Sequence, residues 1–371
     1  QDLKGAKELI TAEGGSQAQL GIIKFMEVYA YSVLVDTFGN VPFTEALNPE
    51  NPSPMYDDAA GIYTALASHL EEAIGDLSSG NGFDGSQDIA YAGNINQWRK
   101  AAISLKLRMA MRLADSNSSV SQTMAESAFN AGPITGNTDN FGINYLSAAP
   151  NTNPLWVSLV QSGRKDFVAA NTLVDAMNPN SDPRLPSFFQ TYEGNFVGGT
   201  YGSANGASSN SDLSELIKTP DLKGDLITAA EVHFLLSEAA ARGYSVGGSA
   251  EAYYNSAIEV SMDEWGVSAA DTATYLALEE VAYGTAAGDW MQKIGSQKWV
   301  AMYNNGFEGW TAWRLFDLGL NGPLVDGITL AIPTRFLYPT SEATLNGSQY
   351  DTAASAIGGD SKTTKVFWDV N

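Results

Sequence analysis

The stretch that decides the fold is YAYSVLVDTFGNVPFTEAL, residues 29–47, in which an apolar helical pattern ends in an acid, a glycine and a proline. Gly39 can adopt the positive φ that ends a helix, and Pro42 prevents the helix from continuing. Asp36 then falls in the last helical turn, where the negative end of the helix dipole disfavours a carboxylate. A compensating donor is expected. The candidates are the backbone amides of residues 37–41, Arg314 or Arg335, with a bound cation as the alternative.

Helical periodicity continues beyond this stretch and dominates the chain. Apolar residues recur at helical spacing in 62–77 and 95–113. The segment 228–242 begins with Thr and has Glu three residues later, which is a capping signature, and it ends at Gly243. Short joints group the predicted helices into pairs near 2–37, 58–114, 228–265 and 270–304. Such pairs resemble tetratricopeptide repeats, in which small residues face large ones. We therefore predict a mainly α fold.

The composition of the chain excludes several classes of partner and of catalytic site. The net charge of −22 repels phosphate backbones and anionic lipid, so neither nucleic acid nor a lipid surface is an expected partner. The chain has no cysteine, which excludes disulfides, thiolate nucleophiles and cysteine-based metal sites. His69 and His233 lie in separate segments, so we expect no metal site and no cofactor. No run approaches the roughly 18 apolar residues that span a bilayer.

Two clusters in the sequence have a structural interpretation. Trp310, Trp313 and Arg314 follow one another at helical spacing and can share a face, which predicts core packing with a buried ion pair. In DPRLP, residues 182–186, the Asp–Pro–Arg order predicts a turn with an internal charge pair.

The candidate binding residues are aromatics in polar loops. Exposed aromatic planes beside hydrogen-bonding side chains suit a ligand with apolar faces and polar edges. The irregular stretches 132–153 and 193–212 are rich in Gly, Asn, Ser and Thr, and the second is flexible by composition. The predicted ligand-binding residues in or near such loops are Trp156, Tyr192, Phe196, Tyr201, Tyr283 and Trp290. No catalytic residue stands out.

Five segments, in order, resemble one family. They are DTFGNVPFTEAL (36–47), AEVHFLLSEAAARGY (230–244), QKWVAMYNNGFEGWTAWR (297–314), IPTRFLYPTSEATLNGSQYDTA (332–353) and the closing KVFWD (365–369). Together they resemble the SusD/RagB-like proteins, and the second SusD-like subfamily in particular. The first segment, for example, is similar to the family pattern D-x-[YF]-G-[DN]-[VI]-P-[YF]-x-E-A-L.

This resemblance implies a fold and a role. It implies one SusD-like domain over residues 1–371, with loop-rich parts at 132–227 and 319–371. It implies a lipid-anchored protein of the outer membrane, at the cell surface, that binds oligosaccharide or polysaccharide without catalysis. Because sugar rings present apolar C–H faces edged by hydroxyl groups, the six loop aromatics named above become the expected glycan-binding residues. The implied partner is a SusC-like TonB-dependent transporter that imports the glycan. Members of the family usually carry about a hundred further N-terminal residues from a lipidated cysteine, so we expect the anchor, and part of some glycan sites, to be absent here.

Two other functions remain open at this point. With 42 acidic residues, a carboxylate pair suited to a glycoside hydrolase can occur in the fold, although no pair stands out. The helix pairs alone could also serve as a scaffold for protein–protein interaction, without any sugar. The acidic, lysine-poor composition is compatible with a saline habitat, and hence with a marine β-1,3-glucan or alginate as the glycan.

Overall fold

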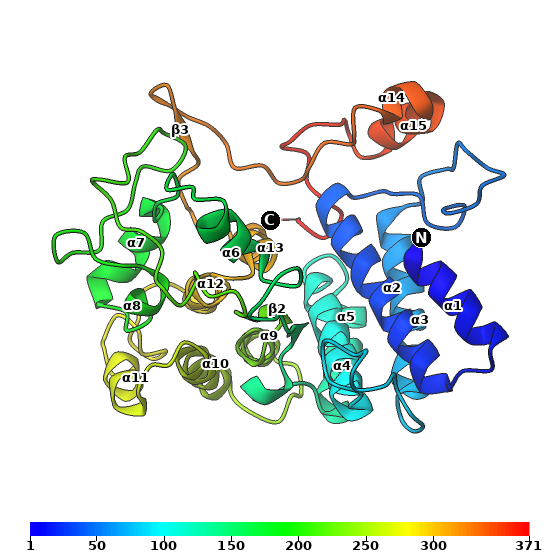
Figure 1. Cartoon of the computed structure of the whole chain (residues 1–371), viewed down its shortest axis with the longest axis horizontal. Coiled ribbons are helices and arrows are strands. Elements are labelled where there is room, and N and C mark those ends of the chain that lie inside the picture. Colours follow the sequence, from blue (N-terminus) through cyan, green and yellow to red (C-terminus); the bar gives the residue numbers. More distant parts are fainter. Residues whose placement is uncertain (371) are drawn as a thin grey trace. The chain divides into compact units, whose positions relative to one another are not determined.

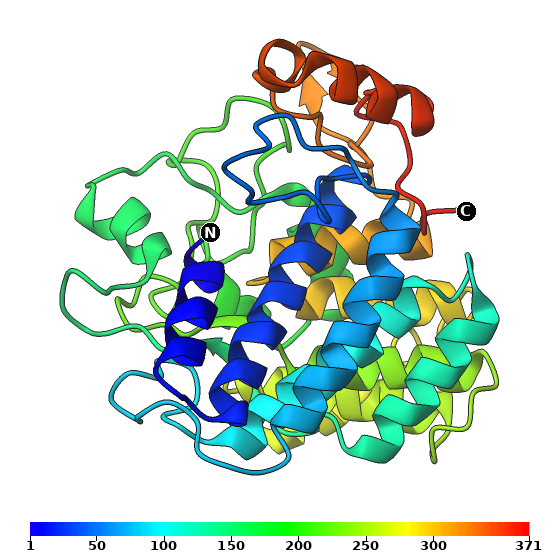
Figure 2. The same ribbon diagram turned by 90° about the vertical axis from the view of Figure 1, so that its right-hand side faces the viewer.

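The computed structural model describes residues 1–370, and it is mainly helical (Figures 1 and 2). The chain divides into two compact units. Unit 1 comprises Gln1–Pro133 and Pro333–Asn371, and unit 2 comprises Ile134–Ile332. Unit 2 is therefore an insertion in the sequence of unit 1.

Unit 1 is built on long antiparallel helices, which lie side by side in Figure 2. The Ser16 side chain and Gln19 form a capping box at the start of the second helix. Asp58, Asn94 and Asn117 cap the helices that follow. The helices of unit 1 are α1 (Asp2–Ala12), α2 (Gln17–Phe38), α3 (Ala59–Asp76), α4 (Ile95–Arg112), α5 (Ser118–Ala131), α14 (Glu342–Leu345) and α15 (Gly347–Ala356).

Helix α2 corrects one expectation. It has 22 residues with a mean hydropathy of 1.3 in its most apolar window, so by length and composition it could cross a membrane. The sequence analysis missed this because small and polar residues interrupt its apolar run. In the structure α2 packs against α3 and buries Phe25, Val28 and Val35. A helix of this kind is equally typical of a protein core.

The Asp36 carboxylate is buried and fully engaged within unit 1. It accepts hydrogen bonds from the Tyr63 hydroxyl at 2.5 Å and from Trp368 Nε1 at 2.8 Å. The Nε of Arg112, a fully buried side chain, lies 3.4 Å from the second carboxylate oxygen. The expected compensating donors are therefore present, and they include Tyr63, Trp368 and Arg112, which were not among the candidates named from the sequence. No cation is needed to balance this carboxylate.

Arg335 contacts the end of α2, at Phe38. Its Nε and Nη2 donate to the carbonyl oxygen of Phe38 at 3.2 and 3.1 Å, which satisfies an acceptor at the end of α2. Its Nη1 pairs with Asp360 at 2.6 Å. Gly39 adopts φ +80°, as expected of the residue that ends the helix. The motif 36–47 thus binds the C-terminal segment of the chain at two points.

Unit 2 contains shorter helices and two small antiparallel sheets. Its helices are α6 (Pro154–Trp156), α7 (Asn171–Met177), α8 (Leu185–Phe188), α9 (Ala229–Ala241), α10 (Ala250–Glu264), α11 (Ala269–Leu276), α12 (Trp290–Ala301) and α13 (Gly306–Phe316). Single turns occur at η1 (Asn137–Asp139), η2 (Val157–Gln161, a π-helix) and η3 (Asn178–Asn180). The strands are β1 (Phe141–Ile143) with β2 (Gly224–Ile227), and β3 (Leu324–Val325) with β4 (Ile328–Thr329).

The predicted features of unit 2 are mostly confirmed. The Thr228 side chain accepts a hydrogen bond from the Glu231 backbone at 3.2 Å, and Gly243 has φ +85°. Asp182 and Arg184 form a fully buried two-point ion pair, with distances of 3.0 and 2.6 Å. The Arg314 guanidinium lies 3.6 Å from the centre of the Trp310 ring, so these two residues share a face, while the ion pair of Arg314 and the place of Trp313 on that face stay predictions.

Candidate functional site

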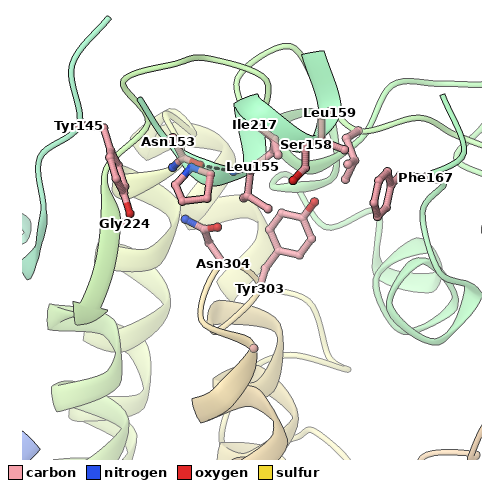
Figure 3. Close-up of a pocket in the computed structure, with 13 residues that line it drawn as sticks. Tyr145, Asn153, Leu155, Ser158, Leu159, Phe167, Ile217, Gly224, Tyr303 and Asn304 are labelled. Carbon is pink, nitrogen blue, oxygen red and sulfur yellow. Dashed lines mark hydrogen bonds between the residues drawn. The ribbon is translucent and has the colours of Figure 1, made fainter. Parts of the chain in front are cut away.

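A cavity of about 630 Å³ in unit 2 combines aromatic and polar walls (Figure 3). The residues that line it come from separate parts of unit 2: Tyr145, the segment 153–167, Leu213 and Ile217, Gly224 at the start of β2, and residues 303–306 at the junction of α12 and α13. Its floor continues into the core of unit 2. Ile217 on the floor is buried, and Leu159, Leu213 and Tyr303 pack against the same core cluster.

One wall is a short helical segment fixed at its start by Asn153. The Asn153 side chain accepts from the Leu155 backbone N–H and donates to the carbonyl of Leu222, each at 2.7 Å. Its own backbone N–H donates to the Pro220 carbonyl at 2.7 Å. Pro154 occupies the first helical position, where its missing N–H costs nothing. Because these bonds use the Asn153 side chain, it positions the wall and is not available to a ligand.

Aromatic rings form the ends and the middle of the cavity, as Figure 3 shows. The Tyr145 ring lies against Gly224, where a Cβ would meet the ring at 3.0 Å, so the glycine allows the close approach. Phe167, at the other end, is 40% exposed and carries the Arg164 guanidinium 4.8 Å from its ring centre. Tyr303 lies between them and stacks on Phe188 at 4.0 Å.

Several polar groups in the cavity have no partner among residues 1–370. These are the Tyr145 hydroxyl, the Ser158 hydroxyl and the Asn304 side-chain amide. By contrast, the Tyr303 hydroxyl lies 3.5 Å from the Phe188 carbonyl, and burial raises its pKa. The open groups offer both donors and acceptors beside exposed rings. That combination suits an uncharged, hydroxyl-rich ligand with apolar faces.

A half-buried acid pair lies next to the cavity wall. Asp225 follows Gly224 on β2, and Glu264 ends α10. Burial, and then the Asp225 charge, raise the pKa of Glu264 to about 8, while burial also raises the pKa of Asp225. Lys223 Nζ lies 3.1 Å from Asp225, and the Asn140 amide lies 3.5 Å from Glu264. Both pKa shifts favour the protonated form of a carboxyl in this pair, and the contacts with Lys223 and Asn140 help to fix β2.

The six aromatics predicted from the sequence do not line this cavity. Trp156 belongs to the wall segment, but its neighbours Leu155 and Ser158 face the cavity instead. Phe196 packs against the core cluster of unit 2, and Tyr192 lies in a tight turn bridged to Asn195. These three residues therefore lie outside the lining of the cavity, and their contact with a glycan stays a prediction.

The other three lie at separate places. Tyr201 is 43% exposed, but its backbone is held by the Asn171 side chain and by Leu324 N–H, at 2.9 and 2.8 Å. The loop predicted to be flexible therefore carries many fixed hydrogen bonds. Trp290 carries the Arg242 guanidinium 5.1 Å from its ring centre. Tyr283 packs on Tyr254, with Lys293 Nζ 5.5 Å from its ring centre.

Sequence reasoning missed the residues that do line the cavity. Tyr145 lies inside the loop 132–153, which the sequence singled out, and Phe167 follows the polar run GRKD. The rule applied to the other aromatics would have selected both. Tyr303 and Asn304 follow the end of α12 and lie within the segment 297–314, which resembled a family motif. Its helical pattern predicts packing in the core, so neither residue was selected as a ligand contact.

Solved structures with the same fold cover this chain almost completely. A chitin-binding SusD homologue from Flavobacterium johnsoniae is 26% identical, with a TM-score of 0.85 over 100% of this chain and 85% of that chain. A SusD homologue from Bacteroides uniformis is 25% identical, with a TM-score of 0.87 over 100% of this chain and 84% of that chain. A SusD-like protein from Bacteroides thetaiotaomicron is 27% identical, with a TM-score of 0.80 over 94% and 80%.

These similarities confirm the mainly α, SusD-like fold that the sequence motifs predicted. A comparison with curated proteins gave no match. The model of the SusD-like_2 family, described as "Starch-binding associating with outer membrane", matches residues 1–339. The chain belongs to this family.

Proposed function

We propose that this protein binds oligosaccharide or polysaccharide at the cell surface and passes it to a TonB-dependent outer-membrane transporter, without catalysis. The observation that carries the proposal is the cavity in unit 2. There the Tyr145 and Phe167 rings lie beside the open polar groups of Ser158 and Asn304. The family description and the chitin-binding homologue support a sugar as the ligand.

The chemistry of the cavity favours a neutral glycan. No Asp, Glu, Lys or Arg is among the residues that line it, and the Arg164 guanidinium over the Phe167 ring is already paired with Asp166 at 2.6 Å. Aromatic stacking contributes roughly 0.5–1.5 kcal/mol per ring beyond the buried area, so binding is expected to be weak to moderate. It should also depend little on salt. These properties suit a protein that must release its ligand to a transporter.

The same lining supports binding over hydrolysis. A glycoside hydrolase needs two carboxyl groups on either side of the scissile bond, and the residues that line the cavity supply none. The half-buried pair Asp225 and Glu264 adjoins the wall, but neither residue lines the cavity. The proposal therefore assigns the cavity to recognition alone.

The test is a titration with maltohexaose and chitohexaose, which represent starch-type and chitin-type glycans, followed by calorimetry on variants. Replacing Phe167 or Tyr145 by Ala should weaken binding about twofold to tenfold, which is the loss of one stacked ring. Phe336→Ala is the matched control, because this ring is 57% exposed and lies in unit 1. A screen of further polysaccharides, β-1,3-glucan and alginate included, follows if neither probe binds.

Two outcomes would count against the proposal. If both site variants bind like the parent while Phe336→Ala does not, the cavity in unit 2 is not the glycan site. If no polysaccharide in the screen binds the parent protein, the glycan function itself is wrong and the scaffold alternative gains support.

Delivery to a transporter needs a separate test. A full-length tagged protein, lipid-anchored as the family resemblance implies, should co-purify from outer membranes with a large β-barrel protein under mild detergent. Loading the complex with a bound glycan should not remove the transporter. Recovery of the tagged protein alone would refute this part of the proposal and leave the glycan-binding part standing.

A further inference from the structure

A second groove, of about 690 Å³, lies within unit 1. Helix α1 forms one side of it and the 43–47 loop the other, with α2 and α3 beneath. Val28 and Leu66 form a buried apolar floor. Lys4 Nζ donates to the Leu47 carbonyl at 2.9 Å, which ties α1 to the loop. The groove is thus defined by fixed elements on every side.

Three rings line one wall of this groove. Tyr31 and Phe43 meet edge to face, with their centres 4.9 Å apart and their planes at 89°. The His69 ring lies 6.2 Å from Phe43 at an angle of 35°. Tyr31 and Phe43 are half-buried and His69 is exposed, so each ring keeps a surface open to a ligand.

The polar groups of the groove are partly unused. Within residues 1–370, no hydrogen bond reaches the Tyr31 hydroxyl or either ring nitrogen of His69. Burial, followed by the charges of Glu27 and Asp57, raises the pKa of Tyr31, so its hydroxyl stays a donor at neutral pH. On the opposite wall Lys7 and Glu27 form an ion pair at 3.3 Å.

The charges in the groove cancel. Its lining includes two lysines, Lys4 and Lys7, and two glutamates, Glu8 and Glu27. Such a lining has no preference for an anion or a cation, but it offers donors and acceptors to hydroxyl groups. With the exposed rings and the apolar floor, this matches the faces and edges of a neutral sugar. The volume lies within the range of about 300–1,000 Å³ that is usual for ligand sites.

We propose that the groove between α1 and the 43–47 loop is a second binding site for a neutral oligosaccharide, in addition to the cavity of unit 2. The inference rests on the proposed function for its ligand class, but its residues belong entirely to unit 1.

The experiment uses the full chain labelled with 3-fluorotyrosine and titrated with maltohexaose and chitohexaose. Each site then has its own fluorine reporter, Tyr31 in the groove and Tyr145 in the cavity, and each signal is assigned from its Tyr→Phe variant. We expect the Tyr31 signal to shift and saturate with at least one probe. It should do so equally in the Asn304→Ala variant, which alters only the cavity.

Variants of the groove complete the test. His69→Gln and Phe43→Ala should each weaken the response of Tyr31 about threefold to tenfold and leave Tyr145 unchanged. Phe129→Ala, a half-buried ring on α5 outside the groove, is the matched control and should change neither. Circular dichroism of each variant checks that unit 1 stays folded, and His69→Gln, at an exposed position, keeps the test valid if Phe43→Ala does not fold.

The two reporters separate the possible failures. A shift of Tyr145 with a static Tyr31 overturns the second site and leaves the proposed function intact. A shift of Tyr31 with a static Tyr145 supports the groove and removes the cavity from the proposed function. If neither signal moves, both sites are refuted for these sugars. If sedimentation shows that His69→Gln breaks a dimer and sugar does not bind the groove, the occupant is a second copy and the inference is wrong.

Discussion

Replacing Asp36 by Ala should destabilise unit 1 strongly. In the native structure this carboxylate accepts from Tyr63 and Trp368 and lies beside the Arg112 guanidinium, with side chains that are 4% and 0% exposed for Asp36 and Arg112. Removing one partner of a buried ion pair leaves the other charge in a place without water, which typically costs about 3–5 kcal/mol. We therefore expect the free energy of unfolding of unit 1 to fall by about that amount.

Two further variants separate charge from hydrogen bonding. Asp36→Asn keeps an acceptor for Tyr63 and Trp368 but removes the charge, so the expected loss is smaller, about 1.5–3 kcal/mol. Combining it with Arg112→Met removes both charges, and the double variant should be more stable than the sum of the two single losses predicts. Asp351→Ala is the control, because this exposed acid on α15 has no hydrogen bond within the described residues.

Urea unfolding followed by hydrogen exchange with mass spectrometry is the assay. It resolves the peptides of α2–α4 in unit 1 from those of unit 2, so the loss can be assigned to one unit. The reasoning is refuted if Asp36→Ala lowers the free energy of unfolding of unit 1 by less than about 1 kcal/mol, the range of an exposed ion pair. It is also refuted if Asp351→Ala lowers that free energy as much as Asp36→Ala does.

Three further predictions concern activity, pH and the ligand. No glycan that the protein binds should release reducing ends above a buffer control, and release abolished by a single Asp or Glu substitution would contradict this. Because the pKa of Glu264 is raised to about 8, its contribution to stability is full below pH 4.5 and is lost as pH rises to 8. Glu264→Gln should flatten that fall in urea unfolding at pH 5 and pH 8, and an unchanged slope would refute the assignment. Replacing Trp156, Tyr201 or Trp290 by Ala should weaken glycan binding about tenfold in calorimetry wherever the ring faces the ligand, and parental binding by all three would exclude these positions.

The helices could be predicted well from the sequence because their signals are local. The periodic segments 62–77, 95–113 and 228–242 became α3, α4 and α9 with ends displaced by a few residues. Caps such as Thr228 and the positive φ of Gly243 depend on neighbours within one turn. The order of the family motifs along the whole chain predicted the architecture, which the family model and the solved structures confirmed.

The partners of Asp36 could not be predicted, because they are distant in sequence. Arg112 is 76 residues away and Trp368 is 332 residues away. Several arginines were equally plausible by type, and only packing selects among them. The need for a donor was correctly inferred from the helix dipole, whereas its identity was not.

The cavity of unit 2 was missed for a similar reason. Tyr145, Phe167 and Tyr303 come from three segments that are brought together only by the fold. An aromatic residue in a loop can stack on a ligand or pack against the core and so hold its loop in place, and a single sequence does not distinguish the two cases. Phe196, which packs on the core, and Phe167, which is open to the cavity, show both outcomes.

The bond between Asp36 and Trp368 has a consequence for the order in which the chain can fold during synthesis. Unit 2 is encoded entirely between the two parts of unit 1, so its contacts are all available before residue 333 leaves the ribosome. Asp36 and Arg112 in unit 1 lack their tryptophan neighbour until Trp368 emerges. Closing so long a loop is entropically slower than folding the insertion within it. Unit 1, although its first helices are synthesised before unit 2, is therefore expected to reach its native state after unit 2.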